Sequence, residues 1–226
     1  MKHFHGEMLE PFLARAECIE KNLAILERAT FPPKISEDIK KLRKNYNLLQ
    51  NFSLPHIEKK IGYQFKNANL FLILFLYREI AKIFNEVKNL EKNERTEMVI
   101  PEKTLAEMLQ LKETMLSLAF IGDSAIETGV IRSVWPTDNP HSLPRKGTLD
   151  AKKKFFTVGL NQAILWNFLS LSFGRSSPSS PDSNTLKSSQ FEALFGIIYL
   201  ESGAVAVESA NLTLKSNFEK NQEILS

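Results

Sequence analysis

The chain has 226 residues, 43% of them hydrophobic, and a formal net charge of +3 at pH 7. This length and hydrophobic content are sufficient for a full core in one or two domains. The single cysteine, Cys18, excludes an internal disulfide and a zinc site made of several thiolates, and it falls on a helical apolar pattern typical of a core residue. A net charge of +3 is too small to identify a nucleic-acid-binding protein by itself.

Neither a membrane span nor a secretory signal is apparent in the sequence. The apolar run around residues 70–76 is too short to cross a bilayer, and the N-terminal Met1-Lys2-His3-Phe4-His5 lacks the hydrophobic stretch of a signal peptide. We therefore predict a cytoplasmic protein without membrane association.

Residues 1–52 are expected to form a helical hairpin. Apolar residues recur at helical spacing from Leu9 to Leu26, before Phe31-Pro32-Pro33 interrupts the pattern. A second helix is predicted to start near Ser36 and to reach a break near residues 53–55. The hairpin carries no catalytic motif, and one hypothesis is that it serves as a protein-interaction module.

Residues 55–226 are also expected to be helical, so the predicted fold class is all-α. No alternating strand pattern and no internal repeat occurs, and no second basic domain is appended. Charged residues 92–97, the proline-containing residues 137–147 and the Ser/Pro-rich residues 174–189 are predicted loops. The predicted helices are 55–61, ending at Gly62, then 67–91, 101–109, 113–134, 148–156, 160–171, one that follows residue 189, and 205–224.

Two of these hydrophobic helices carry acids. Asp123 and Glu127 are four residues apart on one helix face, and Glu192 lies near the start of another apolar helix. Each acid, taken alone, has the simple alternative of a solvated or salt-bridged side chain. If the two helices pack together, Asp123 and Glu192 can share one Mg²⁺ or Mn²⁺, with Glu127 in support, and a metal-bound water is a nucleophile for phosphodiester hydrolysis.

A cluster of basic residues lies between the two acidic helices, opposed within it by Asp150 alone. These side chains are suited to phosphate contacts, although a run of lysines is also typical of a solvated helix face. The members of the cluster are Arg145, Lys146, Lys152, Lys153 and Lys154.

The two acidic segments resemble the conserved motifs of the ribonuclease III endonuclease domain. Phe120-Ile121-Gly122-Asp123-Ser124 is similar to the signature of that family, and Phe191-Glu192-Ala193-Leu194 looks like its second motif. Upstream, Ile61-Gly62-Tyr63-Gln64-Phe65-Lys66 resembles the opening of the same domain. The resemblance covers residues 55–218, with an insertion near residues 88–112, and we assign residues 55–226 to this domain. No double-stranded-RNA-binding domain is expected.

Two of the four acids usual in that family are absent, because Ala119 and Ser189 occupy their positions. The active-site pattern is closest to Mini-ribonuclease III, which the chain resembles in Ala119, Asp123, Glu127 and Ser189. The N-terminal hairpin and the insertion are not part of the pattern of that compact enzyme. We therefore interpret the chain as a divergent relative of it.

The resemblance implies an all-helical, metal-dependent endoribonuclease that acts on double-stranded or structured RNA as a homodimer. It implies Asp123 and Glu192 as metal ligands and places Phe120 at the dimer interface, where the alternative is a core position within one chain. The missing acids favour a second hypothesis, in which the chain is a catalytically degenerate RNA-binding or ribonucleoprotein component that keeps the fold.

Overall fold

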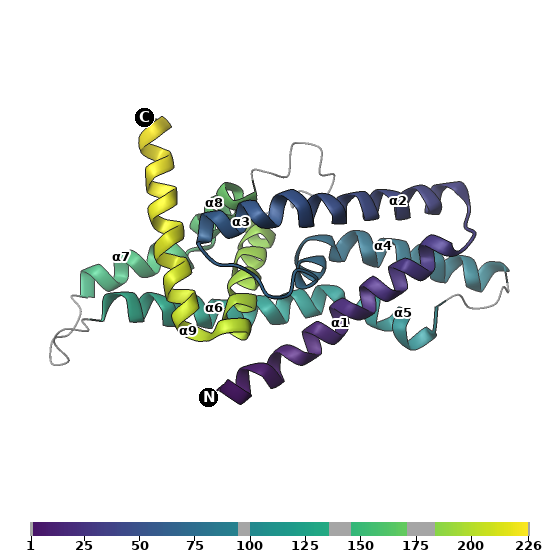
Figure 1. Ribbon diagram of the computed structural model, residues 1–226, viewed down its shortest axis with the longest axis horizontal. Helices are drawn as coiled ribbons and strands as arrows, with labels where there is room; N and C mark the ends of the chain where they lie inside the picture. Colours follow the sequence, from purple (N-terminus) through teal and green to yellow (C-terminus); the bar gives the residue numbers. More distant parts are fainter. Residues whose placement is uncertain (1, 95–99, 136–145, 171–183, 226) are drawn as a thin grey trace.

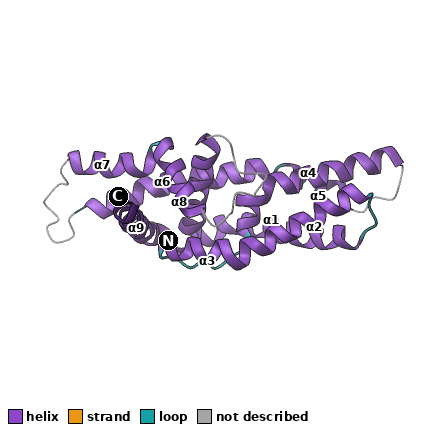
Figure 2. Cartoon of the chain, turned by 90° about the horizontal axis from the view of Figure 1, so that it is seen from above, coloured by secondary structure: helices purple, strands orange, loops and turns teal. Residues whose placement is uncertain are grey.

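The computed structural model describes residues 2–94, 100–135, 146–170 and 184–225. Within these ranges the ordered elements are helices and no strand occurs, which confirms the predicted all-α class (Figures 1 and 2). The elements are α1 (Lys2–Arg28), α2 (Pro33–Leu48), the π-helix η1 (Leu49–Ser53), α3 (Leu54–Ile61), α4 (Leu70–Glu94), α5 (Glu102–Leu109), α6 (Leu111–Val134), α7 (Lys146–Thr157), α8 (Gly159–Ser170) and α9 (Asn184–Leu225).

Several predicted boundaries were wrong. The chain does not break near residues 53–55, because η1 joins α2 to α3 directly and Pro55 lies in the first turn of α3. The predicted loop 174–189 ends earlier, since α9 begins at Asn184 and Ser188 is already buried. Residues 92–94 and 146–147, also predicted as loop, are helical in α4 and α7. The remaining predicted loop residues, 95–97, 137–145 and 174–183, lie outside the described residues.

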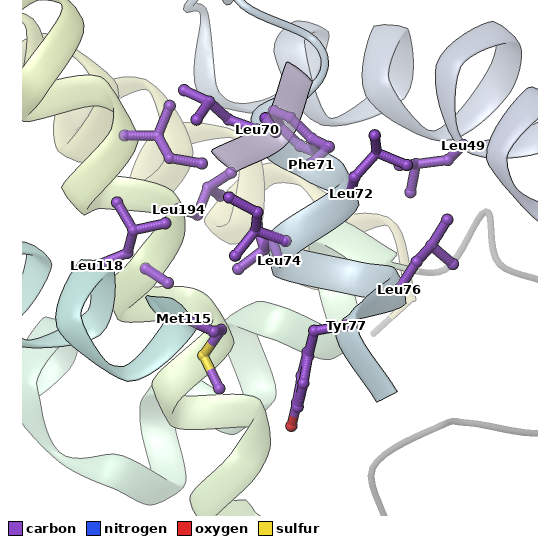
Figure 3. Packing of buried hydrophobic residues seen from close by; sticks show 14 of the residues in the cluster. Leu49, Leu70, Phe71, Leu72, Leu74, Leu76, Tyr77, Met115, Leu118 and Leu194 are labelled. Atoms are coloured by element: carbon purple, nitrogen blue, oxygen red, sulfur yellow. The ribbon is translucent and has the colours of Figure 1, made fainter. Parts of the chain in front are cut away.

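The start of α4 lies at the centre of the core. Residues 70–74 are fully buried, so this apolar run is surrounded by other helices on all sides. Figure 3 shows side chains of α4, α6 and α9 packed together, among them Leu74, Leu118 and Leu194.

The N-terminal hairpin shares this core. One cluster of buried apolar residues extends from Leu9 to Leu214. Arg15 of α1 donates a 2.6 Å hydrogen bond to Thr114 of α6, and Asn69 donates one of 2.8 Å to Glu20. The predicted units 1–52 and 55–226 are therefore joined by buried apolar contacts as well as by the chain.

Helices α6 and α9 approach each other unusually closely. A Cβ placed on Gly122 would lie 1.7 Å from the carbonyl oxygen of Glu192, and one on Gly196 would lie 2.2 Å from the carbonyl oxygen of Leu118. No side chain larger than hydrogen fits at either position without separating the backbones. Both acidic motifs are thus fixed against each other at this crossing.

Glu201 ties the loop between α3 and α4 to α9. Gly62 ends α3 in the left-handed region with φ of 66°, and Gly203 kinks α9 just after Glu201 with φ of 77°. The Glu201 carboxylate accepts hydrogen bonds from the Tyr63 hydroxyl, the Lys66 and Asn67 backbone N–H groups and the Asn67 amide. The Gly-Tyr-x-Phe-Lys-Asn stretch therefore has a structural role here, in docking the loop onto α9.

Two helices, Leu111–Val134 and Asn184–Glu223, are long and apolar enough to cross a membrane by length and composition. Half of the first apolar window and 56% of the second are buried within the protein itself, which is also typical of core helices in soluble proteins. The cytoplasmic location stays a prediction.

Replacement of Gly196 by alanine should destabilise the protein by about 3 kcal/mol or more, because the new methyl group meets backbone that cannot move aside alone. Urea unfolding followed by circular dichroism measures the change. Gly147→Ala is the matched control: among the described residues nothing lies within 4 Å of its Cβ position, so a gain of about 0.5 kcal/mol is expected. Equal stability of Gly196→Ala and wild type would contradict the close crossing.

Candidate functional site

The crossing of α6 and α9 brings Asp123 and Glu192 together. Asp123 directly follows Gly122, which packs on the backbone carbonyl of Glu192. Asp123 is exposed and Glu192 is half-buried. The two predicted metal ligands are therefore neighbours at the surface of the crossing.

The pKa of the Glu192 carboxyl is raised above its ordinary value, mainly by burial. The negative charge of Asp123 raises this pKa further, whereas the Gln162 amide and the Ser188 hydroxyl beside the carboxylate lower it. Two like charges in a partly desolvated place repel each other. A cation between them would relieve that repulsion.

Gln162 and Ser188 support Glu192 from α8 and α9. The Ser188 hydroxyl donates to Oε1 of Gln162 and also lies 3.5 Å from Oε1 of Glu192. Both side chains are buried, Gln162 with 1% of its surface exposed. The sequence predicted no role for Gln162 or Ser188. Gln162 lies outside every motif, and no local signal indicates that α8 packs beside Asp123 and Glu192.

The third predicted acid, Glu127, forms an ion pair. Its carboxylate lies 2.7 Å from the ammonium of Lys153 on α7. The pKa of Lys153 is raised, chiefly by Glu127 and to a smaller extent by Asp123 and Asp150. Lys153 thus lies beside both acids of the α6 face, and Glu127 is committed to it in this structure.

The structure describes only part of the predicted basic cluster. Lys152 donates to the carbonyl of Ser133 at 3.3 Å, so it contacts α6 as Lys153 does, and Lys154 is exposed. Lys146 is the first residue of α7, and Arg145 lies outside the described residues. The structure therefore places four lysines of the cluster on α7, and two of them, Lys152 and Lys153, contact α6.

Phe120 is 79% exposed, one turn before Asp123. The alternative of a core position within one chain is therefore wrong. Leu116 lies one turn earlier on α6 and is 36% exposed, and Leu160 and Ile164 of α8 are also exposed. An apolar surface thus accompanies the acidic pair on α6.

The residues present fit one hydrated hard cation better than a tightly enclosed one. No group of three or more His, Cys, Asp or Glu side chains suited to a metal occurs in the described ranges. Asp123 and Glu192 supply two carboxylates, which suffices for Mg²⁺ because this ion keeps several waters. The buried Nε2 of Gln162 lies beside the Glu192 carboxylate but makes no hydrogen bond of normal geometry, so its capacity as a donor is not fully used.

No protein-family model, curated protein or solved structure matches the chain. The likeness of its motifs to ribonuclease III thus remains a prediction.

Glu192→Gln should stabilise the protein in metal-free buffer, because it removes a half-buried charge beside Asp123 and keeps the hydrogen-bonding shape. After screening by solvent, a gain of about 0.5–1 kcal/mol is expected, or a rise in Tm of about 1–3 °C. Thermal unfolding in the presence of EDTA measures it. Glu127→Gln is the control and should give no gain, because Glu127 faces Lys153. A lower Tm for Glu192→Gln would contradict this view of the site.

Proposed function

We propose that the chain is a divalent-metal-dependent endoribonuclease of ribonuclease III type, which hydrolyses phosphodiester bonds in double-stranded or structured RNA during RNA processing. The observation that supports this most directly is the meeting of Asp123 and Glu192. These residues are distant in sequence, and the contact of Gly122 with the Glu192 backbone makes them neighbours. The two carboxylates repel each other without a cation, whereas together they can bind one.

Asp123 and Glu192 would hold Mg²⁺ or Mn²⁺, which would lower the pKa of a bound water and neutralise charge on the phosphate. The protein's own groups prepare the site for this. Ser188 and Gln162 favour the ionised form of Glu192 against the effect of burial. Glu127 holds the Lys153 ammonium near Asp123, where a positive charge can meet an RNA phosphate.

The proposed RNA surface includes α7, next to the acids. Lys152, Lys153 and Lys154 project from this helix, and Arg145 and Lys146 precede them in sequence. Double-stranded RNA is bound mainly by shape, through phosphates and 2′-hydroxyls. A helix carrying lysines at the edge of a cation site matches that chemistry without a separate RNA-binding domain.

A homodimer belongs to this proposal. Phe120 and Leu116 leave an apolar strip exposed on α6, and a contact around a twofold axis would bury it against the same strip of a second copy. The two sites would then face the two strands of one duplex. We place this dimer in the cytoplasm.

The second candidate function is a catalytically degenerate RNA-binding or ribonucleoprotein component. The ion pair between Glu127 and Lys153 favours it, because the third acid is neutralised. Ala119 and Ser189 remove two more acids from the site. The same RNA surface and dimer would serve this function without hydrolysis.

The full chain should cleave long double-stranded RNA with Mg²⁺ or Mn²⁺ and should not cleave it with EDTA. Asp123→Asn and Glu192→Gln should each reduce the rate by about 10² or more, because each removes a ligand. Glu127→Gln should cause a smaller loss. Gel analysis of labelled duplex, with binding measured in parallel, gives both quantities.

The two candidate functions give different results in this assay. RNA binding without cleavage, equal in wild type and Asp123→Asn, would reject the enzyme and support the degenerate component. Lys154→Glu should weaken RNA binding under either function, since it reverses an exposed charge of α7.

Phe120→Glu should convert the dimer to a monomer, because two like charges would then meet near the twofold axis. Analytical ultracentrifugation of wild type and variant measures the change. Ile131→Glu, at an exposed apolar position farther along α6, is the matched control and should leave the association state unchanged. A monomeric wild type at micromolar concentration would contradict the dimer.

A further inference from the structure

We propose that Gln162 is a positioning residue of the cation site, whose amide holds Glu192 in place for a bound divalent cation. This inference rests on the proposed cation site and extends it to α8, a helix outside the motifs. Gln162 is 1% exposed and lies beside the Glu192 carboxylate.

The orientation of the Gln162 amide is fixed from one side. The Ser188 hydroxyl donates to its Oε1, so that this oxygen is turned toward Ser188. Gly159, at the start of α8, lies against Ser188, with its Cβ position 3.6 Å from the hydroxyl oxygen. Helix α8 is thereby held close to α9 next to the acids, and the amide nitrogen remains as the free end.

That nitrogen, Nε2, is buried and makes no hydrogen bond of normal geometry in this structure. A buried donor without an acceptor costs free energy, so most such donors in native proteins are satisfied. Its charged neighbour is Glu192. The free donor capacity of Nε2 has an explanation if Nε2 donates to the Glu192 carboxylate when that carboxylate ligates a cation.

Nε2 carries two N–H donors, which suits two tasks at once. One donor can bind the Glu192 carboxylate, and the other can bind a water that the cation carries. Carboxylates that ligate metals are normally held by such hydrogen bonds, and their loss typically costs 10–100-fold in metal affinity. In a site with two acids instead of four, this support from an amide gains importance.

A purely structural role for Gln162 predicts a different outcome. A structural amide would contribute to folding, so its replacement by leucine would destabilise the protein whether or not metal is present. The Ser188 bond to Oε1 makes such a contribution in either case, and its loss is expected to lower the urea midpoint. A positioning role of Nε2 predicts in addition that the replacement reduces metal affinity, which a structural role alone does not.

The test is Mn²⁺ titration calorimetry on the full-length chain, with urea unfolding in metal-free buffer. Gln162→Leu should bind Mn²⁺ at least 10-fold more weakly than wild type, and a cooperative urea transition shows that the variant is folded. The matched control is Asn167→Leu, which makes the same amide-to-leucine change at an exposed position of α8 and should bind as wild type does. Equal affinity in folded Gln162→Leu and wild type would overturn the inference.

A second variant keeps the test decisive if Gln162→Leu does not fold. Gln162→Met keeps the length of the side chain without the amide and should also bind Mn²⁺ at least 10-fold more weakly than wild type; affinity equal to that of wild type would overturn the inference. Absence of Mn²⁺ binding in wild type and Asp123→Asn alike would reject the cation site itself, and this inference with it. That result differs from binding that is normal in wild type and equally normal in Gln162→Leu.

Discussion

The close crossing of α6 and α9 is the constraint on which the rest of the structure depends. At Gly122 and Gly196 the backbones themselves are in contact, so no side chain separates the two helices at this point. This contact makes neighbours of Asp123 and Glu192, which belong to separate motifs. Side chains at the crossing would have pushed the helices apart and with them the two carboxylates.

The surrounding core holds the crossing of α6 and α9 in place. Residues 70–74 of α4 are fully buried, and Leu74, Leu118 and Leu194 pack where α4, α6 and α9 meet (Figure 3). Glu201, beyond the crossing on α9, adds hydrogen bonds that tie down the loop before α4. A rigid core can place two acids in a position that is unfavourable for folding, because other contacts offset the repulsion.

Helical periodicity was sufficient to predict the fold class, most helices and the shared face of Asp123 and Glu127. These signals are local, so a single sequence carries them. The start of α9 at Asn184 was missed, because serine-rich composition indicates a loop while the burial of Ser188 is set by α8. The roles of Gln162 and Lys153 were beyond prediction for the same reason: each depends on where another helix packs.

The charges at the site can be counted once Lys153 is included. The acids of α6 and α9, Asp123, Glu127 and Glu192, and the ammonium of Lys153 together carry two negative charges when all are ionised, while Asp150 of α7 acts on Lys153 more weakly. One divalent cation balances this charge, whereas a site with four acids and no lysine is suited to two cations. Both the absence of acids at Ala119 and Ser189 and the presence of Lys153 thus reduce the negative charge of the site. In electrostatic terms these groups match the single divalent cation that we propose, with the Lys153 ammonium as a further positive charge near Asp123.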